Sequence, residues 1–230
     1  MDDCNAAGGI LGRKIELHLE EETSAKETVE RFKKLTLQTK CDAIMGIIST
    51  GNGLAVAAVA EDFGQLWLSW DGTTQKGVAE TMPSPKFSFK SANNESEAVG
   101  GAMLTAKHFP DIKTVAGLQP DYSYGRNCWE AYKTALKHYN PKVEFVLDLW
   151  PKLGTTDFSS HIAAIKKAKP DLLMSSLWSG DGPVFFKQGM AVGLFKEMKA
   201  CFVSNGLVHE SLKKDFVPEG IILGYNSLYF

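Results

Sequence analysis

The sequence predicts an α/β fold built on parallel sheets, because short apolar runs alternate with amphipathic segments along the whole chain. Two stretches show clear helical spacing. Residues 25–39 place Val29, Phe32 and Leu35 on one stripe, and residues 158–167 repeat the pattern. Turn-forming sequences such as "MPSP" and "YNPK" separate the periodic segments.

Nine apolar runs have the length and composition of strands. They occupy residues 14–20, 42–48, 65–70, 87–90, 114–119, 143–150, 171–177, 199–204 and 220–225. Further helices are expected over residues 53–63 and 95–108. A lobe boundary is expected near residue 112, where the second of these helices has ended and a new strand–helix series begins. The predicted division is therefore 1–112 and 113–224.

Composition excludes several classes of protein. With 230 residues and 44% hydrophobic content, the chain can bury one large core or two of about 100 residues each. A net charge of −2 gives no basic surplus for nucleic acid, and no apolar run approaches the ~20 residues of a membrane helix. The four cysteines form no C-x-x-C pair, and the five histidines lack metal-ligand spacing. No metal or other cofactor is therefore expected.

The stretch "IMGIISTGNGLA" has the glycine spacing of a phosphate-binding loop, from Gly46 to Gly51. Asn52 and Gly53 stand where such a loop needs Lys and then Ser or Thr, so a nucleotide site is rejected. The stretch instead predicts a strand, the loop "STGNG" and a helix. Free N–H groups at a helix N-terminus attract any anion, including a carboxylate.

Ligands of parallel sheets bind outside the carboxyl ends of the strands. The polar and aromatic residues that follow the predicted strands are Ser49, Thr50, Gly51, Trp70, Asp71, Gly72, Thr73, Thr74, Asp121, Tyr122, Tyr124, Trp178, Ser179, Asp181 and Asn205. Hydroxyls, acids and aromatic rings suit a small organic molecule.

Four segments in the same order resemble the solute-binding proteins of ABC transporters of the branched-chain amino acid type, which have the type I periplasmic-binding-protein fold. These segments are "NAAGGILGRKIEL", "DYSYGRNCWEAYKTAL", "TTDFSSHIAAIKKAKPDLLM" and "VPEGIILGY". The resemblance implies two doubly wound parallel-sheet lobes joined by a hinge and closing on a solute. It also implies truncation at both ends, with residues 225–230 starting a crossover back to the first lobe. Such a fragment would expose part of its first lobe's core.

The resemblance carries over to individual positions. It implies that Thr50 and Gly51 hold the carboxylate of the ligand, and that Gly72 and Thr73 supply backbone groups and a hydroxyl. Tyr124 and Trp178 match aromatic positions of the family. Ser49 belongs to the same loop as Thr50.

One position departs from the family. Amino acid binders carry an acid where Asn205 stands, and a buried ammonium without an anion is costly. Asp71 or Asp181 would then replace that acid, unless the ligand has no amino group. Trp70 and Trp178 favour a ligand with a flat or apolar body, since indole offers a large face for stacking. The run Glu20 to Glu22 is expected to end a strand in water, with docking to a transporter partner as the alternative.

The leading hypothesis is a non-enzymatic carrier that works outside the inner membrane, periplasmic or lipid-anchored, and delivers a small carboxylate-bearing solute to an ABC permease. The solute is a branched-chain or other amino acid, or an aromatic or branched organic acid. The alternative is a ligand-sensing domain of an amide- or amino-acid-responsive regulator or receptor. An enzyme using Asp71 or Asp181 as a base lacks a supporting motif.

Overall fold

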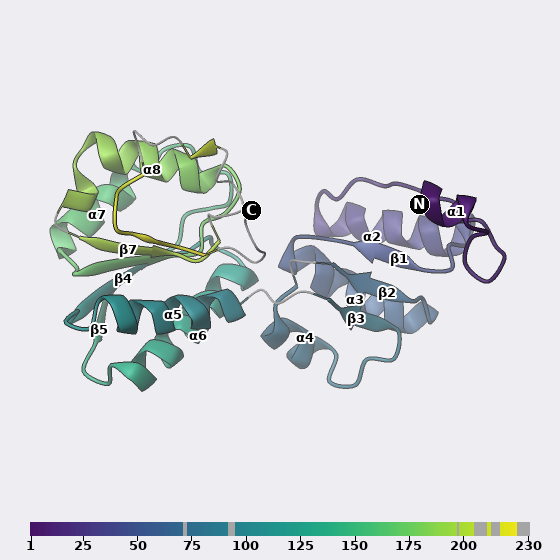
Figure 1. Cartoon of the computed structure of the whole chain (residues 1–230), viewed down its shortest axis with the longest axis horizontal. Coiled ribbons are helices and arrows are strands. Elements are labelled where there is room, and N and C mark those ends of the chain that lie inside the picture. Colours follow the sequence, from purple (N-terminus) through teal and green to yellow (C-terminus); the bar gives the residue numbers. More distant parts are fainter. Residues whose placement is uncertain (71–72, 92–94, 197, 205–210, 213–216, 225–230) are drawn as a thin grey trace.

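The computed structural model describes residues 1–70, 73–91, 95–196, 198–204, 211–212 and 217–224. It shows two parallel sheets, each with its own helices, side by side as two lobes (Figure 1). The predicted α/β class with parallel sheets is confirmed. The first sheet has the order β1-β2-β3, and the second has the order β5-β4-β6-β7-β8.

The first lobe contains three strands and the helices that cover one face of their sheet. Its elements are α1 (Asp2–Ala6), α2 (Ala25–Lys34) with a π-helical extension (Leu35–Thr39), β1 (Ile44–Gly46), α3 (Thr50–Phe63), β2 (Trp67–Ser69), α4 (Gln75–Thr81) and β3 (Ser88–Lys90).

The first sheet has one buried and one open face. Ile44 and Trp67 are neighbours in register and face the core of this lobe, where both are buried. Met45, Leu68 and Phe89 form the next row across the three strands and point to the opposite face. Met45 is 67% exposed and Phe89 is 53% exposed. The expected exposure of apolar side chains in the first lobe is therefore observed.

The second lobe contains the remaining elements around the five-stranded sheet. They are α5 (Ser96–His108), β4 (Thr114–Leu118), α6 (Ser123–Tyr139), β5 (Glu144–Leu149), α7 (Ser159–Ala168), β6 (Leu172–Ser175), α8 (Asp181–Ala191), a 3₁₀ turn (Leu194–Lys196), β7 (Lys199–Phe202) and β8 (Ile222–Leu223).

Helices cover both faces of the second sheet, as a parallel sheet requires. Trp129 and Tyr132 of α6 pack on one face together with Ala102 of α5. Phe158, next to α7, and Phe185 of α8 pack on the other face. The strand order places β5 on one side of β4 and β6 on the other. The chain therefore adds β5 in one direction along the sheet and the strands from β6 onward in the opposite direction. This is the doubly wound arrangement, and its switch point lies between β4 and β6.

Two expectations differ from the structure. The apolar run over residues 14–20 is not a strand. Among the described strands β1 pairs with β2 alone, and the backbone N–H and C=O of Ile15 bond the side chain of Asn5 instead of a neighbouring strand. Leu17 and Leu19 are accordingly exposed. The lobe boundary was expected after residues 95–108, yet the corresponding helix α5 packs against α6 and β7, so the helix joins the core of the second lobe.

The Gly100-Gly101 pair shows why α5 fits there. A Cβ at Gly101 would lie 2.7 Å from Val203 Cγ1 and 3.0 Å from Cys201 Sγ, whereas a Cβ at Gly100 would meet nothing within 4 Å. Only Gly101 is needed for close contact between α5 and the sheet.

Candidate functional site

The first lobe contributes the turn between β1 and α3. The helix begins at Thr50 with Ser49 as its N-cap, so the predicted loop over residues 49–53 is wrong for all but Ser49. Neither Gly51 nor Gly53 has a positive φ. Gly53 is required for packing instead, because a Cβ there would lie 2.0 Å from Thr73 Oγ1. The small residues that suggested a loop thus allow the first turn of α3 to approach Thr73.

An internal carboxylate caps this turn. Glu22 Oε2 accepts a hydrogen bond from Ile48 N at 2.7 Å, and Oε1 accepts one from Ser49 N at 2.9 Å. Asn52 Nδ2 donates to the same Oε1 at 2.8 Å and also to Thr23 O at 2.8 Å. The carboxylate at this turn in the structure is the protein's own, and the predicted binding of a ligand carboxylate there stays a prediction. The expectation that Glu22 ends a strand in water is wrong, because its carboxylate turns inward onto the helix N-terminus.

Thr73 lies beside this turn, at the carboxyl end of β2. It is buried, and its hydroxyl shares a hydrogen bond of 3.1 Å with Ser69 Oγ. Trp70 lies at the same strand end but is 58% exposed, with its side chain outside the core of this lobe. Of the residues predicted around β2, the structure thus places Thr73 next to α3 and leaves Trp70 at the surface.

The second lobe contributes the two loops at its switch point. Gln119 follows β4 and Ser176 follows β6, and both are buried. Ser176 N and Ser176 Oγ donate to Gln119 Oε1 at 2.8 and 2.6 Å, while Gln119 Nε2 donates to Met174 O at 3.1 Å. This amide fixes the two loops to each other. Sequence reasoning missed Gln119 because it counted this residue as the last of the strand predicted over residues 114–119, whereas β4 ends at Leu118.

Three aromatic side chains stand on these loops. Tyr124 is buried and its hydroxyl bonds the Ser204 hydroxyl, while Tyr122 and Trp178 are half-buried against the same core. Burial raises the pKa of Tyr124 well above its usual value. The indole Nε1 of Trp178 is buried and makes no hydrogen bond of standard geometry among the described residues.

Asp181 opens α8 beside these rings. It is buried, Gly154 N donates to its Oδ2 at 3.1 Å, and burial raises the pKa of the carboxyl. Burial also raises the pKa of Tyr122; the Trp178 indole N–H opposes that shift, and the charges of Glu22 and Asp181 add to it. We call Tyr122, Trp178 and Asp181 the switch-point site.

Direct contacts also join the lobes near this site. Asn127 Nδ2 of α6 donates to Thr74 Oγ1 at 2.6 Å, and Lys76 pairs with Glu130 of α6. Glu95, just before α5, accepts from Gln75 N at 2.8 Å and from Lys76 N at 2.7 Å. The first turn of α4 is therefore attached to the second lobe.

The remaining predicted residues have different outcomes. Asp71, Gly72 and Asn205 lie outside the described residues. Thr50 is buried, and Gly51 is half-buried in the first turn of α3. Within the described ranges, no three His, Cys, Asp or Glu side chains form a group suited to a metal ion. In the same part of the chain, no helix is long and apolar enough to cross a bilayer.

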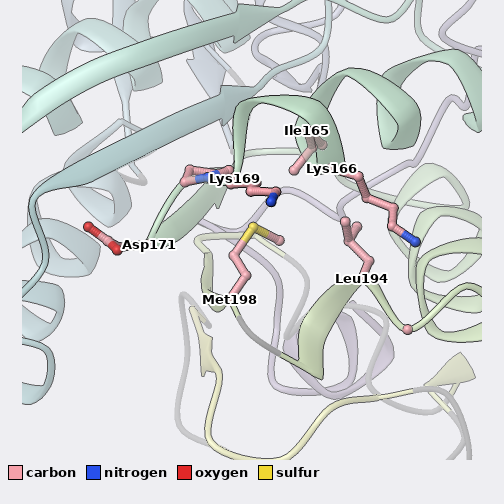
Figure 2. Close-up of a pocket in the computed structure, with 8 residues that line it drawn as sticks. Ile165, Lys166, Lys169, Asp171, Leu194 and Met198 are labelled. Carbon is pink, nitrogen blue, oxygen red and sulfur yellow. The ribbon is translucent and has the colours of Figure 1, made fainter.

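A surface pocket of about 320 Å³ lies elsewhere, at the amino ends of β6 and β7 (Figure 2). Two of its polar side chains are already engaged, since Lys166 Nζ donates to Val192 O and the Asp171 carboxylate accepts from the Lys113 and Thr114 N–H groups. None of the predicted site residues lines it. The pocket therefore plays no part in the site proposed below.

Comparison with known proteins agrees with this geometry. A family model described as "Periplasmic binding protein" matches residues 1–217. The Leu/Ile/Val-binding protein homolog 7 of Brucella suis biovar 1 (strain 1330) is 24% identical over 194 residues, which are 82% of this chain and 48% of the relative. The Leu/Ile/Val-binding protein BraC3 of Rhizobium johnstonii is 25% identical over 193 residues, covering 82% and 50%. The chain thus spans about half the length of the curated relatives it matches.

Solved structures show the same fold. A periplasmic binding protein from Burkholderia mallei superposes with a TM-score of 0.81 at 18% identity, covering 92% of this chain and 56% of that one. A solute-binding protein from Rhodopseudomonas palustris BisB5 in complex with 3,4-dihydroxybenzoic acid gives 0.75 at 23% identity, covering 86% and 54%. The substrate-binding protein LivJ from Streptococcus pneumoniae in complex with isoleucine gives 0.72 at 21% identity, covering 86% and 55%.

Proposed function

Since the chain belongs to the periplasmic binding protein family, we propose that the whole protein is the extracytoplasmic solute-binding component of an ABC importer. The observation that carries the proposal is that two parallel-sheet lobes stand side by side, with Tyr122, Trp178 and Asp181 of the second lobe at the carboxyl ends of β4 and β6 (Figure 1). The second-lobe members stand at the switch point of a doubly wound sheet, where ligands of such sheets bind. A solute held between the lobes would touch both.

The solute is a small molecule that carries a carboxylate. Thr50, Gly51 and Thr73 supply hydroxyl and backbone groups near the N-terminus of α3, where the helix dipole favours negative charge. Tyr124 and Trp178 supply the aromatic wall. Similar proteins were solved with isoleucine and with a dihydroxybenzoic acid, so both amino acids and aromatic acids are candidates.

The proposal includes a partner and a location. The loaded carrier delivers its solute to a membrane permease, and it works in the periplasm or on the outer side of the inner membrane. No reaction is assigned to it. Asp181, considered above as a base, is held by the Gly154 N–H and has no nucleophile or cation bonded to it among the described residues.

The test is mass spectrometry of small molecules that copurify with the full-length protein, followed by thermal-shift assays with isoleucine, benzoate and 4-hydroxybenzoate. A solute at 100 times its Kd adds about 2.7 kcal/mol of stability. Trp178→Ala should abolish the shift. The control Trp150→Ala removes a half-buried indole that stacks under Arg126 instead, and should keep it. Chemical conversion of a bound solute, or the absence of any binding, would refute the proposal.

A further inference from the structure

A pocket of about 320 Å³ in the second lobe opens at the amino ends of β6 and β7, at the opposite end of the sheet from the proposed solute site (Figure 2). We propose that it is a second small-molecule site, separate from the proposed function, for an amphipathic carboxylate. The Lys169 ammonium binds the carboxylate, and the apolar body lies over Ile165, Leu194 and Met198. The four residues of β6 keep the two sites about 13 Å apart, so both can be occupied at once.

The size and the floor of the pocket suit a small molecule with an apolar body. Its volume is at the lower end of the range for ligand sites, about 300–1,000 Å³. At about 30 Å³ per atom it holds roughly ten non-hydrogen atoms. Ile165, Leu194 and Met198 line it and are buried members of the second lobe's core. The floor is therefore packed in place before a ligand arrives, which keeps the ordering cost of binding low.

Lys169 supplies a positive charge that no described residue neutralises. Figure 2 shows its side chain running into the pocket toward Ile165 and Met198. The ammonium group forms no ion pair and no hydrogen bond with any described side chain or backbone group. Lys166 differs, because its ammonium donates to Val192 O at 3.0 Å. A carboxylate that enters the pocket thus meets one cation already free to pair with it.

The backbone of Lys169 has a conformation that few lysines adopt. Its φ of 48° and ψ of 54° lie in the left-handed region at the C-cap of α7, where glycine is the usual residue. Pro170 follows directly and restricts the preceding residue further. Strain of this kind persists where the surroundings impose it, and it gathers at functional sites. Glycine at this position would relieve the strain but would leave the pocket without its unpaired charge.

The single acid that lines the pocket is committed elsewhere. The Oδ2 atom of Asp171 accepts from Lys113 N at 2.8 Å, from Thr114 N at 2.9 Å and from Thr114 Oγ1 at 3.1 Å. These bonds hold the carboxylate at the amino end of β4, and Figure 2 shows it apart from the Lys169 ammonium. The two lysines of the lining outnumber this acid. The pocket therefore favours a monoanion over an ammonium compound.

Octanoate is the probe, because its size matches the roughly ten-atom capacity of the pocket. Octan-1-ol has the same apolar body without the charge, and acetate has the charge without the body. Methyl NMR of the full-length protein reports on Ile165, Leu194 and Met198 directly. Octanoate should shift all three methyl signals in a saturable way and bind about three- to fivefold more tightly than octan-1-ol, as for an exposed ion pair. Acetate at the same concentration should leave them in place.

Lys169→Gln should bring octanoate down to the affinity of octan-1-ol. Lys167→Gln is the matched control, since Lys167 is an exposed neighbour outside the pocket lining, and it should keep the preference. A second pair tests the backbone argument. Lys169→Gly should bind as weakly as Lys169→Gln without loss of thermal stability. Lys40→Gly changes a lysine of the first lobe with the same left-handed conformation, φ 58° and ψ 47°, and should leave octanoate binding unchanged.

Three results would overturn the proposal. The first is the absence of octanoate-induced shifts at the three methyl groups, or shifts confined to methyl groups elsewhere. The second is equal affinity for octanoate and octan-1-ol in the wild-type protein. The third is an unchanged preference for octanoate in a folded Lys169→Gln variant. Each result leaves the proposed function intact, because solute binding is tested separately with isoleucine, benzoate, 4-hydroxybenzoate and Trp178→Ala.

Discussion

Asn127 Nδ2 donates to Thr74 Oγ1 at 2.6 Å, and this hydrogen bond joins α6 of the second lobe to the first turn of α4 in the first. Thr74 Oγ1 also accepts from Gly77 N at 3.2 Å, so the same hydroxyl caps α4. Thr74 is buried and Asn127 is half-buried. The orientation of the lobes and the start of α4 therefore depend on one another.

Asn127→Ala is expected to change the separation of the lobes. It removes the donor to Thr74 and costs about 1 kcal/mol of unfolding free energy, as for a typical hydrogen bond. Spin labels would be placed on the exposed Lys26 and Lys167. The distribution of distances between them, measured by double electron–electron resonance, should broaden or shift. Asn140→Ala is the control, since Asn140 Nδ2 donates to Ile112 O within the second lobe. It should lower stability without altering that distance, and the same distance change in both variants would contradict the prediction.

Gly53→Ala is expected to disturb the site from inside α3. The new methyl group would lie 2.0 Å from Thr73 Oγ1, so Thr73 must move away from Ser69 or α3 must shift. Overpacking of this kind typically costs about 1–3 kcal/mol. Gly100→Ala is the control, because it lies in α5 with nothing within 4 Å and should gain about 0.5–1 kcal/mol through helix propensity. Urea unfolding checks both, and equal effects would show that Gly53 packs less tightly than described.

Asp181→Asn is expected to stabilise the protein at neutral pH. Burial raises the pKa of this carboxyl in the folded state, so its protonated form is favoured there and stability is lost as pH rises through the folded value. The amide variant removes that loss. Its advantage over wild type should be greatest at pH 7 and should shrink as pH falls toward the unfolded pKa. Chemical unfolding at several pH values measures it, and an advantage that grows at low pH would refute it.

Asp171→Asn is expected to behave in the opposite way. The N–H groups of Lys113 and Thr114 lower the pKa of Asp171, so the stability it contributes is present above the unfolded pKa and lost as pH falls through the folded value. The variant should be less stable than wild type at pH 7, and the difference should vanish in acid. A pH-independent difference would mean that the charge of Asp171 is not what stabilises the loop.

Cys128 and Cys201 are expected to resist alkylation in the folded protein. Both thiols are fully buried, and burial raises the pKa of Cys201 to about 12 and that of Cys128 well above its usual value. The thiolate is the reactive form. Mass mapping after iodoacetamide treatment at pH 8 should find labels on Cys4 or Cys41 before either buried thiol. Early labelling of Cys201 would show that α5 does not cover the sheet stably.

The class of fold could be predicted from periodicity because apolar spacing is a local property. Eight of the nine expected strands have a counterpart, and the helix over residues 25–39 is present as α2 with its π-helical extension. The run at residues 14–20 has the same composition as a strand, yet strand formation also requires a partner, which no local pattern reveals. The placement of α5 likewise depends on contacts with Val203, about a hundred residues away.

In the candidate site, too, features set by local sequence could be predicted, and features that depend on distant contacts could not. Strand ends could be predicted, and Tyr122, Trp178 and Asp181 do come together at the switch point between β4 and β6. The inward position of the Glu22 carboxylate could not be predicted, since a run of three acids usually faces solvent. What brings it inward is the set of unsatisfied N–H groups at Ile48 and Ser49, whose position is known only once the chain has folded.

The attachment of α4 to the second lobe also fixes how far each residue can travel. If the lobes rotate while the hydrogen bonds of Thr74, Gln75 and Lys76 persist, the first turn of α4 is the hinge. The displacement of a residue then grows with its distance from that turn. Thr73 is next to this hinge in the sequence and therefore moves little relative to α6. The end of the first lobe that carries α1 lies farthest from the second lobe (Figure 1) and moves most, so a label on α1 would report the angle of rotation more sensitively than one near Thr73.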